Sequence, residues 1–413
     1  MNIKVKRLLA GCLAITLCLS VLTGCGKEMG DINLLMYKDE TEWTIPEELS
    51  TKEAFNLEQT ADLTPLSGNI AKPDKKNHVT LVMSDLDGVS AHTYRQKQAV
   101  ENGYRGILKL AFGTSEFSRP LPVVHKWEAA SNKGAVPNHY IFELSSHEDM
   151  TDAYVVETES TVVPVYNLLL GQEYFWTVTC IFEDGQQWKS PVVKYKTDDK
   201  APRNLNVDGV TNCRDLGGWK TADGKEVKQA MVYRTARMNE NMEETITISA
   251  EGIDWLTNTA KVKTEIDFRV DEIRTTSALG NGVNYINIPT KGTVVNQLRN
   301  YDAEMCEAIK IFAKEDNYPI LFHCSLGTDR TGLLAYLLNG LLGVSEDDLY
   351  LDYAFSNLGD IGSLRKADEI KESYVRVIQG FGKDTVSENV EAYMLEIGVT
   401  KEEICEIKRI MLK

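Results

Sequence analysis

Short runs of alternating apolar and polar positions follow one another between residues 118 and 198. The clearest run covers residues 174–181, which are rich in aromatic and β-branched side chains, and Asp184-Gly185 follows it as a hairpin turn. Short strands separated by turns predict a small all-β sandwich over residues 118–198 with Trp127 and Trp176 in its core. The strands expected there are residues 123–127, 139–144, 161–165, 174–181 and 193–197.

From residue 204 to residue 413, apolar strands alternate with helices. Residues 263–268 and 319–322 have the short apolar runs of buried strands, and the second run leads through a loop directly into an apolar helix. This alternation predicts an α/β fold with a central, mainly parallel sheet flanked by helices. The expected helices are residues 303–314, 331–342, 345–357 and two more at the C-terminus, the last opened by Thr400 and Glu403 as a capping box.

Two stretches separate these units from their surroundings. Residues 198–202 form a polar linker that ends in a proline, as domain boundaries often do. Residues 78–117 combine a short strand-like piece with a mixed helical stretch, a pattern that does not indicate one fold.

The first 24 residues have the pattern of a signal peptide. A basic start precedes an apolar run over residues 8–22 that is too short and too interrupted for a membrane span. Small residues then lead to Cys25, so the segment resembles a bacterial lipoprotein signal, with an ordinary secretory peptide as the alternative. We therefore expect lipidation of Cys25, a tether over residues 25–77, and a protein anchored on the extracytoplasmic side of a bacterial membrane.

Charge and cysteine content exclude several classes of protein. The formal charge of −16 argues against nucleic acid as the main partner, because phosphate backbones are bound by clustered Lys and Arg. No two cysteines have CxxC spacing, so a zinc or redox motif is not expected, and we predict neither metal nor other cofactor. Once the signal peptide and the lipidated residue are set aside, an odd number of cysteines remains: Cys180, Cys213, Cys306, Cys324 and Cys405.

One of these cysteines lies in a stretch that can cradle a phosphoryl group. Residues 323–332 read His-Cys-Ser-Leu-Gly-Thr-Asp-Arg-Thr-Gly, between a predicted strand and a predicted helix. Gly327 permits a sharp turn, successive backbone N–H groups can form an anion nest, and the following helix presents its positive end. Arg330 adds a planar two-donor fork that matches two phosphate oxygens. The expected phosphate-binding residues are Ser325, Leu326, Gly327, Thr328, Asp329 and Arg330.

The same positive field can activate Cys324 as a nucleophile. Helix N-termini and nearby cations lower the pKa of a thiol, so Cys324 can attack phosphorus as a thiolate and form a phosphocysteine that water hydrolyses. Thr331 can hydrogen-bond the sulfur and stabilise it as the leaving group, and His323 can brace the loop through backbone carbonyls. The alternative is that Cys324 is an inert core residue, as most buried cysteines are.

These residues resemble the signature loop of the protein tyrosine phosphatase superfamily. Residues 209–218, 232–235 and 266–269, with Glu272, are similar to bacterial tyrosine phosphatases, a group with atypical members that act on phosphotyrosine, phosphoserine or phosphoinositides. The resemblance covers residues 204–413 and implies a cysteine-phosphatase fold. Thr328 occupies a position where members often have Lys, and Cys213, where Phe is usual, is expected in the core. Residues 118–198 resemble a fibronectin type III domain in pattern.

The leaving group needs a proton, and two carboxyl groups can supply it. The resemblance favours Asp329 in the loop, and Asp267 at the end of a strand is the second candidate. A salt bridge with Arg269 or Arg214 is the structural alternative for Asp267. We expect Arg214, Asp215 and Arg234 to support the site rather than to react.

The neutral loop side chains favour a phosphomonoester such as phosphotyrosine, since pockets for polyphosphates add Lys or Arg around the cradle. Lys291 or Arg299 could still enter the site and make it a phosphoinositide or inositol phosphate phosphatase. A surface protein that holds phosphorylated ligands without turnover is the third possibility. The expected partner is a phosphorylated protein or a small phosphomonoester.

Overall fold

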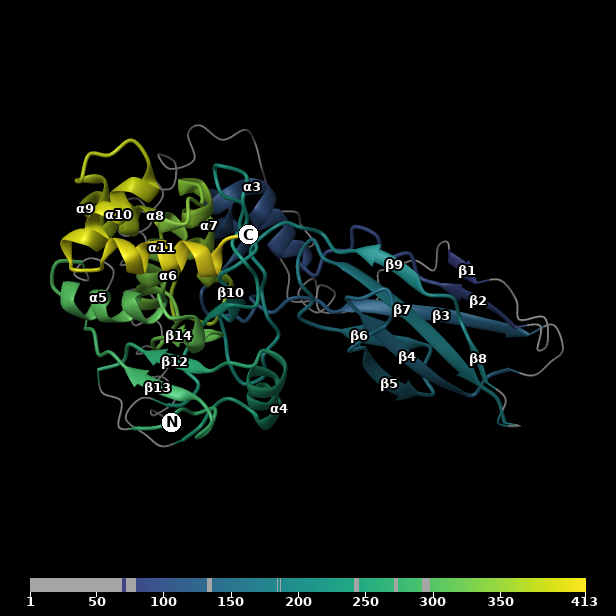
Figure 1. The fold of residues 1–413 in the computed structure, drawn as a ribbon. Helices are drawn as coiled ribbons and strands as arrows, with labels where there is room; N and C mark the ends of the chain where they lie inside the picture. The colour runs from purple at the N-terminus through teal and green to yellow at the C-terminus, as the bar shows by residue number, and fades with distance from the viewer. Residues whose placement is uncertain are drawn as a thin grey trace, which may run out of the picture. The chain divides into compact units, whose positions relative to one another are not determined.

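The computed structural model describes residues 69–71, 79–131, 136–183, 185, 187–240, 245–270, 274–291 and 298–413 (Figure 1). All of them belong to one compact unit, Glu48–Lys413. The predicted signal peptide, Cys25, Asp184, Glu272 and all but three residues of the predicted tether lie outside the described residues. Within those ranges, no helix combines the length and the apolar character that crossing a membrane requires.

An all-β region is built from two antiparallel sheets. The expected strands are present, and β1, β5 and β8 were not predicted; β1 falls within the expected tether. The first sheet has the order β1-β2-β3-β6 and contains β1 (Asn69–Ala71), β2 (Val79–Met83), β3 (Val123–Ser131) and β6 (Val162–Val165). The second has the order β5-β4-β7-β8, with β9 also on β7, and contains β4 (His139–Ser145), β5 (Tyr154–Thr158), β7 (Glu173–Ile181), β8 (Gln187–Lys189) and β9 (Val193–Lys196).

The two sheets share one apolar core. Trp127 on β3, Phe142 on β4 and Trp176 on β7 are all at most 2% exposed, and the Trp127 and Phe142 rings stack 6.2 Å apart. The prediction that both tryptophans are core residues is confirmed. Strand β5 escaped prediction because Tyr154 and Val155, two successive apolar residues, are both exposed, so the strand lacks the alternation that marks a half-buried strand.

Residues 204–413 form an α/β domain around a five-stranded sheet, as the alternating pattern predicted. Its strand order is β10-β11-β14-β12-β13; β10 pairs antiparallel with β11, and the other pairs are parallel. The strands are β10 (Arg214–Asp215), β11 (Val232–Thr235), β12 (Thr264–Asp267), β13 (Asn284–Asn287) and β14 (Ile320–His323).

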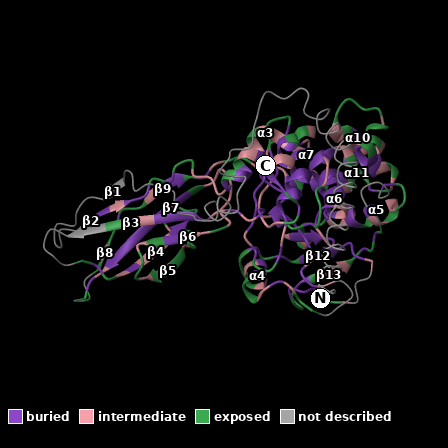
Figure 2. Ribbon diagram, turned by 180° about the vertical axis from the view of Figure 1, so that it is seen from behind, coloured by how far each residue is buried: buried purple, intermediate pink, exposed green. Residues whose placement is uncertain are grey.

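Helical segments cover both faces of this sheet, so β10, β11, β12 and β14 are buried (Figure 2). On β14, Leu321 packs into a core with Leu256 of the π-helical turn Trp255–Thr259, which continues α4 (Ala250–Asp254). The next residue, Phe322, points to the opposite face, where its ring lies 6.1 Å from that of Phe312 at the end of α5 (Asp302–Ile311).

The helix after β14 is central to the domain. In α6 (Asp329–Leu341) every residue from Thr331 onward is buried, which explains why the sequence is apolar on all sides of this helix. The Thr400–Glu403 capping box is confirmed: Thr400 accepts from the Glu403 backbone at 3.2 Å, and Glu403 accepts from the Thr400 backbone at 2.8 Å. The remaining helices are α7 (Glu346–Phe355), α8 (Ala367–Ile370), α9 (Arg376–Gln379), α10 (Val386–Glu396) and α11 (Lys401–Met411).

The stretch 78–117 divides between the two regions. Strand β2 pairs with β3 in the all-β region, although it precedes residue 118. Helix α3 (Tyr94–Leu110) instead packs against α7. The chain after α3 joins the same domain, because the backbone N–H of Phe117 donates to the Leu358 carbonyl at 2.6 Å. Residues 94–121 are therefore structurally part of the α/β domain.

Candidate active site

The predicted cradle is the loop between the end of β14 and the start of α6. Strand β14 lies in the middle of the sheet, so its C-terminal end delivers Cys324 to the crevice where α/β folds usually bind ligands. Gly327 has φ +67°, and a Cβ atom at this position would collide with the backbone of Thr235. Only glycine fits there, which accounts for its place in the motif.

Three successive carbonyl groups of this loop are bound from outside. As a result, the loop backbone is fixed with its carbonyls turned away from the centre, which is the arrangement that lets N–H groups face an anion. The contacts are Arg237 backbone N–H to Ser325 O (3.2 Å), Asn212 Nδ2 to Leu326 O (3.0 Å) and Arg234 Nη2 to Gly327 O (2.8 Å).

Cys324 has the environment of a reactive thiol. It is only 3% exposed, and burial by itself raises the pKa of the thiol. The positive charge of Arg330 and the nearby donors of Thr331 outweigh that effect, so the pKa of Cys324 is lowered overall. A lowered pKa increases the thiolate fraction near neutral pH, and the thiolate is the nucleophilic form.

Arg330 is held with its guanidinium beside the loop. Nη1 donates to the carbonyls of Phe268 at 2.9 Å and Thr290 at 3.1 Å, and Nη2 donates to Ser325 Oγ at 3.1 Å. The two bonds of Nη1 go to segments that follow two neighbouring strands, β12 and β13, and the bond of Nη2 stays within the loop. Together these bonds fix the plane of the guanidinium. An anion bound in the loop can then accept two hydrogen bonds from the guanidinium.

Two of the predicted supporting residues converge on a carboxylate that the sequence did not reveal. Asp352 on α7 accepts from Arg214 Nε at 2.8 Å and from Arg234 Nη1, and all three side chains are buried. Burial alone raises the pKa of Asp352, but the two guanidinium groups hold it below its ordinary value. Asp215 lies elsewhere: it accepts from the Gly217 backbone at 2.8 Å and forms an ion pair with Arg203 at 2.6 Å, so it braces a turn.

The two candidate acids differ in their surroundings. Asp329 lies in the first turn of α6 with its side chain 17% exposed, and it accepts from Tyr353 Oη at 3.2 Å and Arg365 Nε at 3.3 Å. Asp267 is fully buried at the end of β12 and forms an ion pair with Arg269, whose Nη2 lies 2.7 Å from a carboxylate oxygen. The salt bridge considered from the sequence therefore exists.

A groove of about 430 Å³ opens beside the loop. Ser325 and Leu326 of the loop line it together with Arg237, while Glu116 and Arg119 enter from the segment after α3. The groove is thus partly built by residues far upstream of the motif. The two cations proposed from the sequence lie differently: Lys291 is exposed, and Arg299 forms an ion pair with Glu396 at 2.8 Å.

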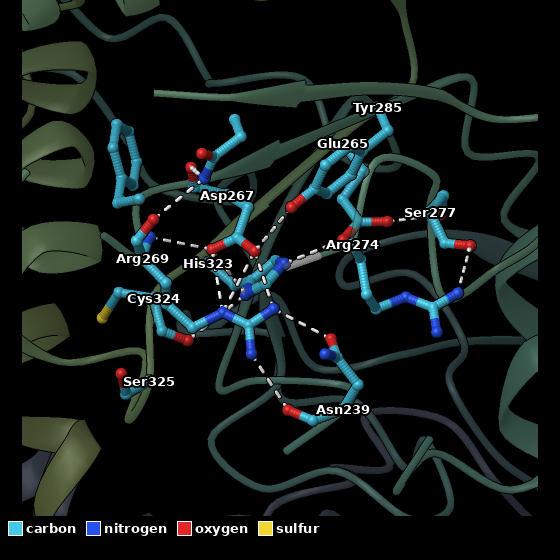
Figure 3. Close-up of polar contacts among 12 residues, drawn as sticks. Asn239, Glu265, Asp267, Arg269, Arg274, Ser277, Tyr285, His323, Cys324 and Ser325 are labelled. Atoms are coloured by element: carbon cyan, nitrogen blue, oxygen red, sulfur yellow. Dashed lines mark hydrogen bonds and ion pairs between the residues drawn. The ribbon is translucent and has the colours of Figure 1, made fainter. Parts of the chain in front are cut away.

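Behind the loop, Glu265, Asp267 and His323 approach one another beside Cys324 (Figure 3). Their ligand-type atoms lie within 4.8 Å of one another, a spacing that a metal site also needs. Each of the three side chains is already hydrogen-bonded or ion-paired with protein groups. The cluster therefore has the structure of an internal hydrogen-bond network.

A nucleophilic cysteine in a nest-forming loop, an arginine fork and a helix N-terminus on a mainly parallel sheet together define a cysteine-based phosphatase. Comparison with known proteins agrees with this class. Residues 205–413, half of the chain, match the sequence profile of the tyrosine phosphatase family. The chain belongs to the tyrosine phosphatase family, and the resemblance noted in its motifs is confirmed.

One relative and two solved structures illustrate the similarity. A protein from Cupriavidus necator, named as an inferred tyrosine-protein phosphatase, is 28% identical over 180 residues, which cover 37% of this chain and 63% of the relative. The core catalytic domain of the PP-IP phosphatase SIW14 from Saccharomyces cerevisiae, solved with citrate, is 18% identical with a TM-score of 0.27 and covers 37% of this chain and 87% of its own. A second structure of the Siw14 catalytic core is 17% identical, covers 37% and 86%, and has the same TM-score.

Proposed function

We propose that this protein is a phosphomonoester hydrolase that works through a phosphocysteine intermediate and acts on phosphotyrosine in proteins. The observation that carries the proposal is the loop geometry, in which the buried thiol of Cys324 follows β14 and the guanidinium of Arg330 is fixed beside the same loop. The loop thus combines a nucleophile with a group that binds anions. This combination suits a phosphate ester, in which the phosphorus atom that is attacked belongs to the anionic group that is bound.

The chemistry proceeds in two displacements. The Cys324 thiolate forms a bond to phosphorus while the bond from phosphorus to the leaving oxygen breaks, and Asp329 in its protonated form gives that oxygen a proton. Water then attacks the phosphocysteine and passes a proton to the Asp329 carboxylate, releasing inorganic phosphate and the thiolate. Arg330 and the loop N–H groups stabilise the phosphoryl oxygens in both steps, and the Thr331 hydroxyl, buried without a partner of its own among the described residues, can donate to the departing sulfur.

Asp329 is the better placed of the two acids, because its side chain is 17% exposed in the first turn of α6, whereas Asp267 is fully buried behind the loop. We expect Asp329→Asn to lower kcat for a phosphotyrosine peptide by about 10²–10³-fold, the usual scale of general acid catalysis. The loss should be much smaller with p-nitrophenyl phosphate, whose leaving group departs without a proton. Asp267→Asn is the matched comparison. If the loss of kcat depended on the leaving group in Asp267→Asn but not in Asp329→Asn, Asp267 would be the general acid instead of Asp329.

The charge of the groove supports a monophosphate substrate. Arg119 and Arg237 face three acidic residues there, Glu116, Glu240 and Asp360, and each arginine is paired with a carboxylate. A pocket in which positive and negative side chains are balanced in this way attracts a second or third phosphate group only weakly. The same two arginines are nevertheless the observation that favours the second candidate, an inositol phosphate phosphatase.

Turnover of a phosphotyrosine peptide and of a soluble inositol polyphosphate, measured side by side with residues 26–413, tests this proposal. We expect kcat/KM to be higher for the peptide. Preference for the inositol polyphosphate would establish the second candidate instead. Tight binding of either compound without release of phosphate would show a ligand-binding protein and contradict the enzymatic proposal.

We also propose that the enzyme acts at the cell surface, held by a lipid on Cys25, because the preceding sequence has the pattern of a lipoprotein signal. Cys25→Ala is expected to abolish labelling of the protein by a radioactive fatty acid and to release it from the membrane fraction. Unchanged labelling and fractionation would exclude this anchor.

A further inference from the structure

Strand β12 places two acidic side chains behind the nucleophile. Glu265 and Asp267 alternate with apolar neighbours in this buried strand, so both point to the same face of the sheet. His323 is the residue that pairs with Asp267 on the adjacent strand β14. All three side chains are at most 1% exposed, so their charges must be matched by neighbouring protein groups.

Both ring nitrogens of His323 face acceptors. Nε2 lies 2.9 Å from Glu265 Oε1, and Nδ1 lies 3.2 Å from the carbonyl oxygen of Cys324. Nδ1 is also 3.8 Å from Asp267 Oδ1. A neutral imidazole has one N–H, whereas the imidazolium donates from both nitrogens. The geometry is therefore that of a charged His323.

Glu265 is the closer carboxylate partner of His323, while Asp267 is shared between His323 and Arg269. Arg269 Nε lies 3.0 Å from both carboxylate oxygens of Asp267, which also accepts from Tyr285 Oη at 3.0 Å. Glu265 pairs with His323 and accepts from the Ser277 hydroxyl with its other oxygen. Burial lowers the pKa of His323, but Asp267 and Glu265 together raise it above its ordinary value despite the opposing charge of Arg269.

We propose that Glu265 is a positioning residue for catalysis: it keeps the imidazolium of His323 donating to the main-chain carbonyl of Cys324, directly behind the nucleophile (Figure 3). The inference rests on the proposed role of Cys324. A positive charge at this carbonyl adds to the fields of Arg330 and of the α6 N-terminus, and it favours the thiolate over the neutral thiol. The hydrogen bond also fixes the first peptide group of the loop.

Glu265→Gln tests this inference because it keeps the size of the side chain and removes its charge. Without the carboxylate, the pKa of His323 is expected to fall, its positive charge is present over a smaller pH range, and the pKa of the Cys324 thiol should rise. The measurement is the rate of alkylation of Cys324 by iodoacetamide as a function of pH. We expect its midpoint, and the acidic limb of kcat/KM, to move to higher pH in Glu265→Gln, while Glu265→Asp, which keeps the charge, stays closer to the native midpoint.

A second pair of variants separates charge from simple structural damage. His323→Asn removes the imidazolium directly and should shift the midpoint in the same direction; Glu265→Gln added to it should shift the midpoint no further. A native midpoint in Glu265→Gln, or equal and additive shifts from the two substitutions, would overturn the inference. Because alkylation needs no substrate, these outcomes are independent of whether the enzyme hydrolyses phosphotyrosine.

Discussion

Replacing Cys324 with serine is expected to lower kcat/KM for a phosphotyrosine peptide by a factor of about 10⁴ or more, as loss of a nucleophile does in other covalent enzymes. The positive surroundings of the loop lower the pKa of a thiol enough to form a thiolate, but a serine hydroxyl is a far weaker acid and stays protonated. The arginine fork and the loop backbone remain in the variant, so binding of phosphate esters should persist while turnover is lost.

Cys405→Ser provides the matched control for this experiment. Cys405 is an exposed cysteine on α11, outside the loop. Its replacement is expected to leave kcat/KM unchanged. Turnover by Cys324→Ser within about tenfold of the native rate, with EDTA present, would contradict the nucleophilic role of the thiol.

The second large effect is expected at Arg330. Arg330→Ala should lower kcat/KM by about 10³-fold or more, which is the scale reported for an arginine that stabilises a transferring phosphoryl group. It should also raise the pKa of Cys324, because the charge of Arg330 is the leading influence that lowers it. Both quantities can be measured on one preparation, by steady-state kinetics and by the pH dependence of thiol alkylation.

Arg330→Lys separates the two contributions of this residue. A lysine keeps a positive charge near the sulfur but cannot make two parallel hydrogen bonds to phosphate oxygens. We therefore expect a thiol pKa close to that of the native protein together with a kcat/KM nearer to that of Arg330→Ala. Full activity in the lysine variant would show that charge alone is sufficient and that the planar fork plays no part.

The loop could be predicted from the sequence because all of its essential parts are local. Cys324, Gly327 and Arg330 are fixed relative to one another by the short link between β14 and α6, so spacing alone determines that they meet. The residues that hold the loop in shape come from distant segments. Asn212 donates to the loop directly and Asp352 holds Arg234, which donates to the loop; no local pattern marks either residue for this role.

Glu265 is a case in which the sequence contained a usable signal. It is a charged residue within a short apolar strand, and such a residue is rarely buried without a partner. The same strand ends in Asp267, two positions later, so both could have been assigned to one face. The identity of the partner, His323 on the neighbouring strand, depends on strand order, which a single sequence does not reveal.

The stretch 78–117 shows a different limit. Strand β2 pairs with β3 although helix α3 lies between them in the sequence. Helix α3 packs on the α/β domain, whose other residues begin about a hundred positions later in the chain. Such non-local pairing leaves no periodic signal in the chain. For the same reason, no pattern in the chain indicated that Glu116 and Arg119 line the groove beside the loop.

The central claim is that the phosphoryl group passes through Cys324. It is tested most directly by mixing the protein with a phosphotyrosine peptide, quenching with acid within the first turnover, and locating the phosphoryl group by peptide mass spectrometry. The account predicts a phosphoryl group on the peptide that contains Cys324 and none in Cys324→Ser. Continued turnover with the phosphoryl group on another residue, or with no covalent intermediate at any quench time, would contradict it.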